Sequence, residues 1–357
     1  MTNSQFIIRH LSFVISMRLA QICDLSYHLP EATLSNEELS QDFTDWAGAK
    51  VLQKIGIEQR PVAAPGETAL DLGFHAAQRL FTQGKCQPDE IDFLLFCTQS
   101  PDYFLPTSAC ILQDKLGLPQ TCGALDFNLG CSGYVYGLAL CKGLIETGMC
   151  QNVLFITSET YTKYINKQDR VNRPLFGDGA SATLIRAVES DCQDPLIGPF
   201  VFGTDGNGAD LLIVPAGGHR LPHNADTAIE KRDGHGNVRS LDQLYMHGSK
   251  IFTFALENIP LMVDELLLRS GKTREQIDVF IFHQANRFIL ERLRQQCNLD
   301  KDRYFNNIRT RGNTVSSSIP IAMIDAQAEG MLKPGHTVML VGFGVGLSWA
   351  ATLVRMP

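Results

Sequence analysis

Residues 125–149 read LDFNLGCSGYVYGLALCKGLIETGM, a short apolar strand, a Gly-Cys-Ser-Gly turn and then a nearly apolar helix. A helix this apolar must be buried in the protein. Its first residue is expected to be Cys131, where unpaired N–H groups and the positive end of the helix dipole favour an anion. A thiol there can ionise well below its free pKa of about 8.5 and act as a nucleophile, and Gly130 and Gly133 allow a substrate to approach closely. The alternative is a small buried hydrophobic residue, the usual role of a free cysteine.

The second half of the chain repeats the first. The segment GKCQPDEIDFLLFC at residues 84–97 is echoed by GKTREQIDVFIFH at residues 271–283. An amphipathic helical pattern precedes each copy, and each copy enters a short apolar strand. The repeat predicts two half-domains of the same design.

The repeat also pairs two chemically useful residues. Cys131 lies 17 residues before Gly148, and Asn313 lies 17 residues before Gly330. Each therefore precedes an equivalent helix in its half, and His283 ends the strand that comes before that unit in the second copy. If the halves are related by two-fold symmetry, Cys131, His283 and Asn313 converge at the centre.

Composition narrows the class of protein. The 44% apolar and 19% charged residues are ordinary for a globular enzyme. A net charge of −7 argues against a general nucleic-acid binder. The ten cysteines include no C-x-x-C pair, which suits a reducing cytoplasm rather than a disulfide scaffold or a zinc site. No apolar run approaches the roughly 18–20 residues of a membrane span, so neither a metal site nor a membrane location is expected.

The chain is expected to divide into a peripheral extension, two halves and a connection. The first residues look faintly like a signal segment, but charged or polar residues interrupt it and no cleavage site follows. We expect these residues to be disordered or to result from a start codon placed too early. The predicted parts are the extension 1–16, the half carrying the cysteine 17–190, the connecting region 191–245 and the half carrying His and Asn 246–357.

Three ordered motifs resemble one protein family: GCSG at residues 130–133, HQAN at 283–286 and GNTVSSS at 312–318. They are similar to the β-ketoacyl-acyl-carrier-protein synthase III family of the thiolase superfamily, and the resemblance covers about residues 17–357. It implies an α/β, thiolase-like fold of five layers, α-β-α-β-α, with two duplicated halves. Further matches are NEEL at 36–39, GIEQR at 56–60, FGDGA at 176–180, MHGSKIF at 246–252 and GFGVG at 342–346.

The resemblance implies acyl transfer to Cys131, followed by a decarboxylating Claisen condensation with malonyl-acyl-carrier-protein. It makes His283 and Asn313 the hydrogen-bond donors to the enolate. The residue types suit that task, because an amide is always neutral and a neutral imidazole donates from one nitrogen. Backbone N–H groups of Cys131 and Val345 are expected to form the oxyanion hole. The alternatives are a buried core histidine and an asparagine that only caps a helix.

Further residues take their roles from the resemblance alone. Leu105, Tyr161 and Phe343 fall at positions of the family's acyl pocket, and Leu105 would reach across a homodimer interface. Arg170 and Asn286 fall at the mouth of the pantetheine tunnel. Ordinary core packing is the alternative for the pocket residues.

The predicted partner is an acyl carrier protein, which is acidic and needs a basic patch on this acidic enzyme. Four cations flank two of the motifs and form the candidate patch, the alternative being an ordinary solvated surface. Lys50 occupies the slot of the family's adenine-stacking tryptophan, and Trp46 lies ten residues before Gly56. Coenzyme A thioesters and acyl carrier protein therefore both stay open as primer donors, and no cofactor is expected. The four patch residues are Lys250, Arg287, Arg292 and Arg294.

Two other functions stay open. One is an acyltransferase of the same fold that passes the acyl group from Cys131 to an oxygen or nitrogen nucleophile. The other is a non-catalytic partner subunit, which would not need Cys131, His283 and Asn313 together.

Overall fold

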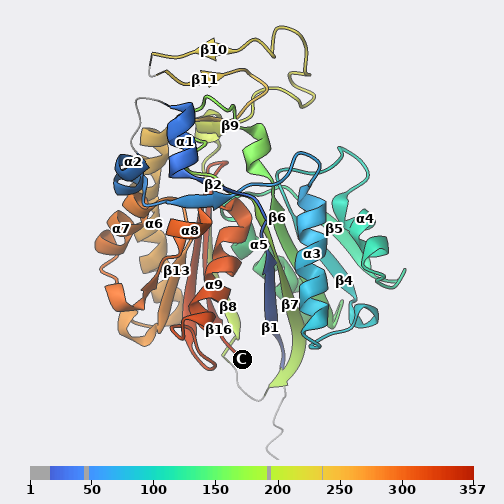
Figure 1. Cartoon of the computed structure of the whole chain (residues 1–357). Coiled ribbons are helices and arrows are strands. Elements are labelled where there is room, and N and C mark those ends of the chain that lie inside the picture. The colour runs from blue at the N-terminus through green and yellow to red at the C-terminus, as the bar shows by residue number, and fades with distance from the viewer. Residues whose placement is uncertain (1–16, 44–47, 191–193, 235) are drawn as a thin grey trace, which may run out of the picture.

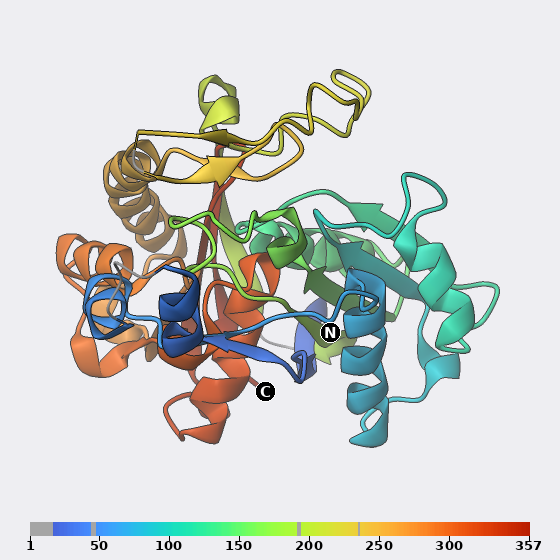
Figure 2. The same ribbon diagram turned by 45° about the horizontal axis from the view of Figure 1, so that its top comes forward.

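The computed structural model describes residues 17–43, 48–190, 194–234 and 236–357. The predicted extension 1–16 and Trp46 lie outside these residues. Figures 1 and 2 show two central sheets with helices between them and on both outer faces.

The first half forms a five-stranded sheet in the order β1-β7-β6-β4-β5. Strands β5, β4 and β6 run parallel, whereas β7 and β1 are added in antiparallel fashion. The strands are Met17–His28 (β1), Phe93–Cys97 (β4), Gly123–Phe127 (β5), Asn152–Glu159 (β6) and Gly179–Ser190 (β7).

The second half forms a second five-stranded sheet, in the order β8-β16-β15-β13-β14. Its pairing directions match those of the first sheet strand for strand, with β14, β13 and β15 parallel and β16 and β8 antiparallel. The strands are Ile197–Thr204 (β8), Val279–Phe282 (β13), Tyr304–Phe305 (β14), Thr337–Gly344 (β15) and Ser348–Arg355 (β16). The duplication predicted from the repeated segments is therefore confirmed in the topology. Strand β8 comes from the region 191–245 that was predicted to connect the halves, so this region also supplies an edge of the second sheet.

Three hydrophobic clusters define five layers. One cluster packs Gly133–Glu146 (α5) and Ser318–Ala328 (α9) between the two sheets. The other two clusters cover the outer sheet faces, so every strand at the centre is buried on both sides and is almost continuously apolar. This arrangement is the predicted α-β-α-β-α order (Figure 1). The outer helices are Ala69–Thr82 (α3) and Ser108–Lys115 (α4) on the first sheet, and Gly248–Ser270 (α6) and Arg287–Gln296 (α7) on the second.

Smaller elements gather at one end of the sheets, where Figure 1 shows α1, α2 and the β10–β11 hairpin. Most of them belong to the N-terminal segment or to the region 205–246, whereas α8 comes from the second half of the chain. Within the described ranges, no helix is long and apolar enough to cross a membrane. These elements are Thr33–Ser35 (β2), Asn36–Asp42 (α1), Gly48–Ile55 (α2), Gln59–Pro61 (β3), Leu212–Ile213 (β9), Lys231–Arg232 (β10), Val238–Arg239 (β11), Tyr245–Met246 (β12) and Ile308–Arg311 (α8).

Close packing of α5 explains one of its glycines. Phe155 of β6 stacks on Tyr134 of α5 at 5.4 Å and on Phe127 of β5 at 6.1 Å between ring centroids. A Cβ at Gly137 would collide with the fixed ring of Phe155, whereas a Cβ at Gly143, on the exposed face of the same helix, would meet nothing within 4 Å.

The two glycines of α5 give a matched test of this packing. We predict that Gly137→Ala destabilises the protein by about 1–3 kcal/mol, because the core cannot give way. Gly143→Ala should instead stabilise it by roughly 0.5–1 kcal/mol, since alanine favours a helix interior. Urea unfolding of both variants measures the difference, and equal effects would contradict the described packing.

Candidate active site

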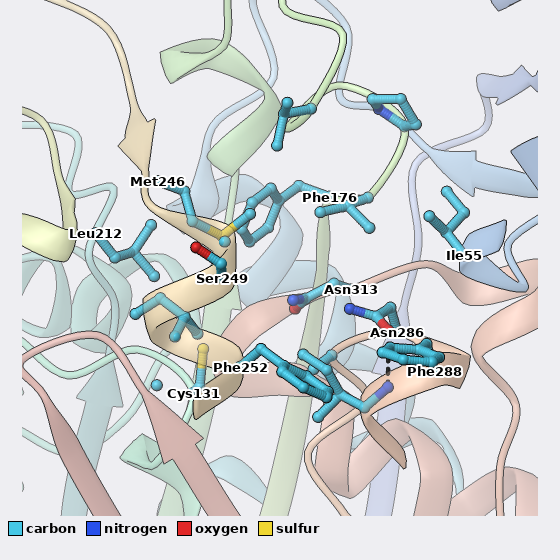
Figure 3. A pocket seen from close by; sticks show the side chains of 18 of the residues that line it. Ile55, Cys131, Phe176, Leu212, Met246, Ser249, Phe252, Asn286, Phe288 and Asn313 are labelled. Atoms are coloured by element: carbon cyan, nitrogen blue, oxygen red, sulfur yellow. Dashed lines mark hydrogen bonds between the residues drawn. The ribbon is translucent and has the colours of Figure 1, made fainter. Parts of the chain in front are cut away.

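A cavity of about 740 Å³ brings together the three residues that the repeat predicted to converge. Cys131 comes from the turn before α5, His283 from the end of β13, and Asn313 from the loop before α9. Each therefore lies next to the end of a central strand or the start of a central helix, and all three line the same cavity. Figure 3 shows Cys131 and Asn313 facing this cavity.

Cys131 is buried and does not begin the helix. Helix α5 begins at Gly133 with Ser132 as its N-cap residue, so the predicted helix start was too early by two residues. Burial raises the pKa of the Cys131 thiol to about 12, while the nearby backbone N–H of Val345 acts in the opposite direction. The predicted low thiol pKa is therefore wrong for the resting protein, because loss of hydration outweighs the local dipoles. The group present at neutral pH is a thiol.

The glycine-rich C-terminal end of β15 packs directly on Cys131. A Cβ at Gly344 would lie 2.7 Å from Sγ of Cys131, and a Cβ at Gly342 would lie 2.8 Å from its carbonyl oxygen. Only glycine allows this approach, which also brings the N–H of Val345 to the thiol. The two predicted oxyanion-hole residues, Cys131 and Val345, are thus neighbours.

His283 is held as a neutral donor or acceptor. Its backbone N–H donates to the carbonyl of Val341 at 2.7 Å, and ring Nδ1 lies 2.7 Å from Oγ of Ser318. The ring meets Phe343 edge-on, at 85° between the planes. Burial lowers the pKa of His283 to about 3, so the imidazole is uncharged at physiological pH.

The side chain of Asn313 has a defined orientation. Its Oδ1 accepts the backbone N–H of Val315 at 2.9 Å, so the amide nitrogen is the group that can donate toward the cavity. The backbone of Asn313 is tied on both sides to the segment around Phe176, through its N–H to Leu175 and its carbonyl to Gly177.

A buried carboxyl group lies behind the site, and the sequence analysis missed it. Glu159 ends β6, a position where a fully buried acid is rare. It accepts hydrogen bonds from the Ser316 hydroxyl at 2.8 Å and from the Gln99 backbone N–H at 3.0 Å. Burial raises the pKa of Glu159 to about 8, so this carboxyl group is mostly protonated at neutral pH and adds little negative charge near Cys131.

The mouth of the cavity combines two of the predicted residues with groups that the analysis did not single out. Arg170 and Asn286 both line the cavity. The guanidinium of Arg170 lies over the ring of Phe43 at 5.2 Å, and Oδ1 of Asn286 caps α7. The rings of Phe252 and Phe288 stack on each other with 5.2 Å between their centroids. Figure 3 shows Phe288 beside Asn286.

The three predicted acyl-pocket residues lie in different surroundings. Phe343 lines the cavity. Tyr161 is buried next to it, packed on Phe176, and its hydroxyl donates to Oε1 of Gln99 at 2.5 Å. Leu105 lies outside the cavity and is 82% exposed.

The four residues of the predicted carrier-protein patch differ in their exposure and in their ion pairing. Lys250, Arg287 and Arg292 are exposed near the cavity mouth. Arg294 makes two hydrogen bonds to Glu291, at 3.0 and 2.6 Å, so its charge is largely compensated.

Taken together, the groups around the cavity suit chemistry in which charge appears only during the reaction. The thiol, the neutral imidazole and the amide carry no fixed charge, while N–H groups are available where an oxyanion would form. In the described part of the chain, no cluster of three or more His, Cys, Asp or Glu residues has a geometry that could hold a metal ion.

Two parts of the chain match the models of a known protein family. Residues 125–206 match the family model of 3-oxoacyl-[acyl-carrier-protein (ACP)] synthase III, and residues 267–356 match the model of its C-terminal part. The β-ketoacyl-[acyl-carrier-protein] synthase III of Caldanaerobacter subterraneus is 36% identical over 94% of this chain and 97% of its own length.

Solved structures of similar proteins superpose on nearly the whole chain. A 3-oxoacyl-(acyl-carrier-protein) synthase III is 50% identical, covers 95% of this chain and 100% of its own, and superposes with a TM-score of 0.93. The corresponding synthase III of Pseudomonas aeruginosa is 30% identical, with a TM-score of 0.82 over 95% of this chain and 98% of its own.

The raised thiol pKa gives a pH-dependent prediction. Because the pKa of Cys131 lies near 12, its thiolate fraction, and hence its rate of alkylation by iodoacetamide, should rise about tenfold per pH unit between pH 7 and 9. Peptide mass spectrometry separates Cys131 from the exposed Cys110, and Cys131→Ser is the control. A rate that stays level across this range would indicate a thiolate already formed at pH 7.

Proposed function

Because this chain belongs to the 3-oxoacyl-[acyl-carrier-protein] synthase III family, we propose that it joins an acyl primer held on Cys131 to a malonyl group delivered by an acyl carrier protein. The observation that carries this proposal is the convergence of Cys131, His283 and Asn313 on one cavity. The reaction is the carbon–carbon bond formation that extends an acyl chain in fatty-acid biosynthesis.

In the first step, Sγ of Cys131 attacks the carbonyl carbon of the primer thioester. The tetrahedral oxyanion accepts hydrogen bonds from the backbone N–H groups of Cys131 and Val345. The departing thiolate takes up a proton equivalent to the one that the thiol of Cys131 loses, so the exchange needs no net proton. A site that holds a resting thiol is compatible with this balance.

In the second step, the malonyl thioester loses its carboxylate as carbon dioxide, and the electron pair of the broken bond forms an enolate. His283 and Asn313 donate hydrogen bonds to the enolate oxygen. The enolate carbon then attacks the acyl carbonyl on Cys131, the new carbon–carbon bond forms, and the carbon–sulfur bond to Cys131 breaks. Cys131 leaves as a thiolate and takes up one proton from solvent, which restores the resting thiol, so the condensation consumes one proton overall. Neutral donors favour this step because a fixed negative charge would repel both the malonyl carboxylate and the enolate.

The mouth of the cavity supports delivery by an acidic carrier. Lys54 and Arg170 line the opening, and Lys250, Arg287 and Arg292 are exposed nearby. A local cluster of cations attracts an acidic partner although the whole chain carries a net charge of −7. We assign the malonyl donor to an acyl carrier protein and leave the primer to either carrier protein or coenzyme A.

The nine free thiols of the described residues fit a reducing cytoplasm.

We further propose that two copies of the chain form a homodimer through the edge of the first sheet. Strand β5 pairs with β4 on one side and has no other strand partner among the described residues. Leu125 on this strand is 45% exposed, and the nearby loop exposes Tyr103, Phe104 and Leu105. An open sheet edge beside exposed aromatic and aliphatic side chains is a template for pairing with a second copy.

The assigned roles predict that the two steps separate by mutation. Cys131→Ala should abolish the acyl adduct while carbon dioxide release from malonyl-acyl-carrier-protein persists. His283→Ala and Asn313→Ala should each retain the adduct but lower carbon dioxide release about 10²–10³-fold, the usual effect of removing one such donor. Intact-protein mass spectrometry and a decarboxylation assay measure the two steps. An adduct on Cys131→Ala would refute the nucleophile, and an adduct in the wild-type protein without any decarboxylation would favour the acyltransferase.

The dimer prediction has its own test. Leu125→Glu should shift the protein toward monomer in sedimentation velocity, because it places a charge on the proposed sheet edge. Leu268→Glu is the matched control, since Leu268 is also exposed but lies on α6, across the molecule from β5 in Figure 1. A wild-type monomer at micromolar concentration, or equal effects of the two substitutions, would contradict the proposed interface.

A further inference from the structure

The buried hydroxyl of Ser318 forms a side-chain hydrogen bond with the imidazole of His283. Ser318 is the first residue of α9, and its Oγ lies 2.7 Å from ring Nδ1. The same oxygen lies 3.4 Å from the backbone N–H of Gln284, which can only donate. Both Ser318 and His283 are almost fully buried, so water does not compete for this contact.

The donors and acceptors around this contact fix which of the two atoms carries the shared proton. A hydroxyl has a single proton and two lone pairs. The N–H of Gln284 occupies one lone pair of Oγ, and within the described chain ring Nδ1 is the acceptor within reach of the hydroxyl proton. The other polar group beside the ring is the carbonyl of Val315, which also accepts the backbone N–H of Ser318. A carbonyl oxygen has two lone pairs and no proton, so it can accept from a ring N–H but cannot donate to Nδ1.

We propose that Ser318 is a positioning residue that donates its hydroxyl proton to Nδ1 of His283 and thereby holds the imidazole as the tautomer protonated at Nε2. In this tautomer, the ring nitrogen that remains for the cavity carries a proton and can donate to a developing oxyanion. In the opposite tautomer it would present a lone pair and repel that oxygen. The inference rests on the proposed function only for its consequence in catalysis, since the tautomer itself is a property of the free protein.

The neutral state makes this hydrogen bond necessary. Burial keeps His283 uncharged, so only one of its two nitrogens carries a proton. Edge-on packing against Phe343 restricts the ring plane but does not distinguish one tautomer from the other. The contact with Ser318 supplies that distinction, much as a carboxylate fixes the tautomer of the histidine in serine hydrolases.

The test pairs Ser318→Ala with Ser317→Ala. Ser317 is also fully buried at the same helix start, but its hydroxyl contacts Thr157 and the carbonyl of Gly179 rather than the imidazole. Ser318→Ala should lower carbon dioxide release from malonyl-acyl-carrier-protein roughly tenfold, the loss expected for one orienting hydrogen bond, and leave acylation of Cys131 nearly unchanged. Ser317→Ala should leave both near the wild-type values. Equal losses in the two variants would reduce Ser318 to a structural residue.

A spectroscopic measurement decides the tautomer independently of turnover. The ¹⁵N signals of His283 in the free protein, assigned by their absence in His283→Gln, should show a protonated Nε2 and an Nδ1 that accepts a hydrogen bond. In Ser318→Ala, the Nδ1 signal should move toward that of a nitrogen without a hydrogen-bond donor. A protonated Nδ1 in the wild-type protein would overturn the proposal. If the wild-type protein released no carbon dioxide, the proposed function would fail while the ¹⁵N spectrum would still decide the role of Ser318.

Discussion

The contact between Gly344 and Cys131 is the constraint on which the site depends. It joins the last residue of a central strand in the second half to Cys131 in the first half, and no side chain fits between them. This approach places the N–H of Val345 beside the thiol. Further hydrogen bonds hold the halves together around it, including Ser132 to Ser348 at 2.5 Å and Glu159 to Ser316 at 2.8 Å. Because the site is built from both halves, its geometry depends on how precisely the two halves pack against each other.

Duplication explains how one chain supplies unlike chemical groups to one cavity. Cys97 ends β4, and His283, at the matching position of the repeat, directly follows the equivalent strand β13; equivalent loops carry Cys131 and Asn313. In the first half, the thiol of Cys97 donates to the carbonyl of Leu129 and is fully buried, whereas its counterpart His283 lines the cavity. The same scaffold thus brings a thiol from one half and an imidazole and an amide from the other to the same cavity. Two halves that begin with the same geometry can diverge at a few residues without a change in the fold.

The sequence predicted most of this arrangement because the repeat and the apolar segments are set by local rules. Apolar runs on both faces of central strands require covering helices, and the equal spacing of Cys131 and Asn313 from their helix ends placed them at equivalent sites. The burial of those sites could not be derived in the same way. The thiol pKa of Cys131 depends on how completely both halves exclude water, and the position of Glu159 behind the site depends on a partner, Ser316, that is 157 residues away. Long-range desolvation has no signature in a short motif, so the direction of the thiol shift was predicted wrongly while its location was predicted correctly.

Burial acts on three titratable groups at the centre of the site in one direction, toward the uncharged form. It raises the pKa of Cys131 and Glu159 and lowers that of His283. Electrostatic interactions are strong in such surroundings, because few water dipoles screen them. A charge that forms during the reaction is therefore stabilised mainly by donors fixed in advance, and a resting charge would occupy those donors before substrate arrives. Because the site is neutral at rest, its hydrogen-bond donors stay available for the charge that forms during the reaction. The orientation of these donors therefore matters more for the reaction than their acidity. The hydrogen bond from Ser318 to His283 and the one from Val315 to Asn313 belong to this requirement, since each fixes which atom of a neutral side chain faces the substrate.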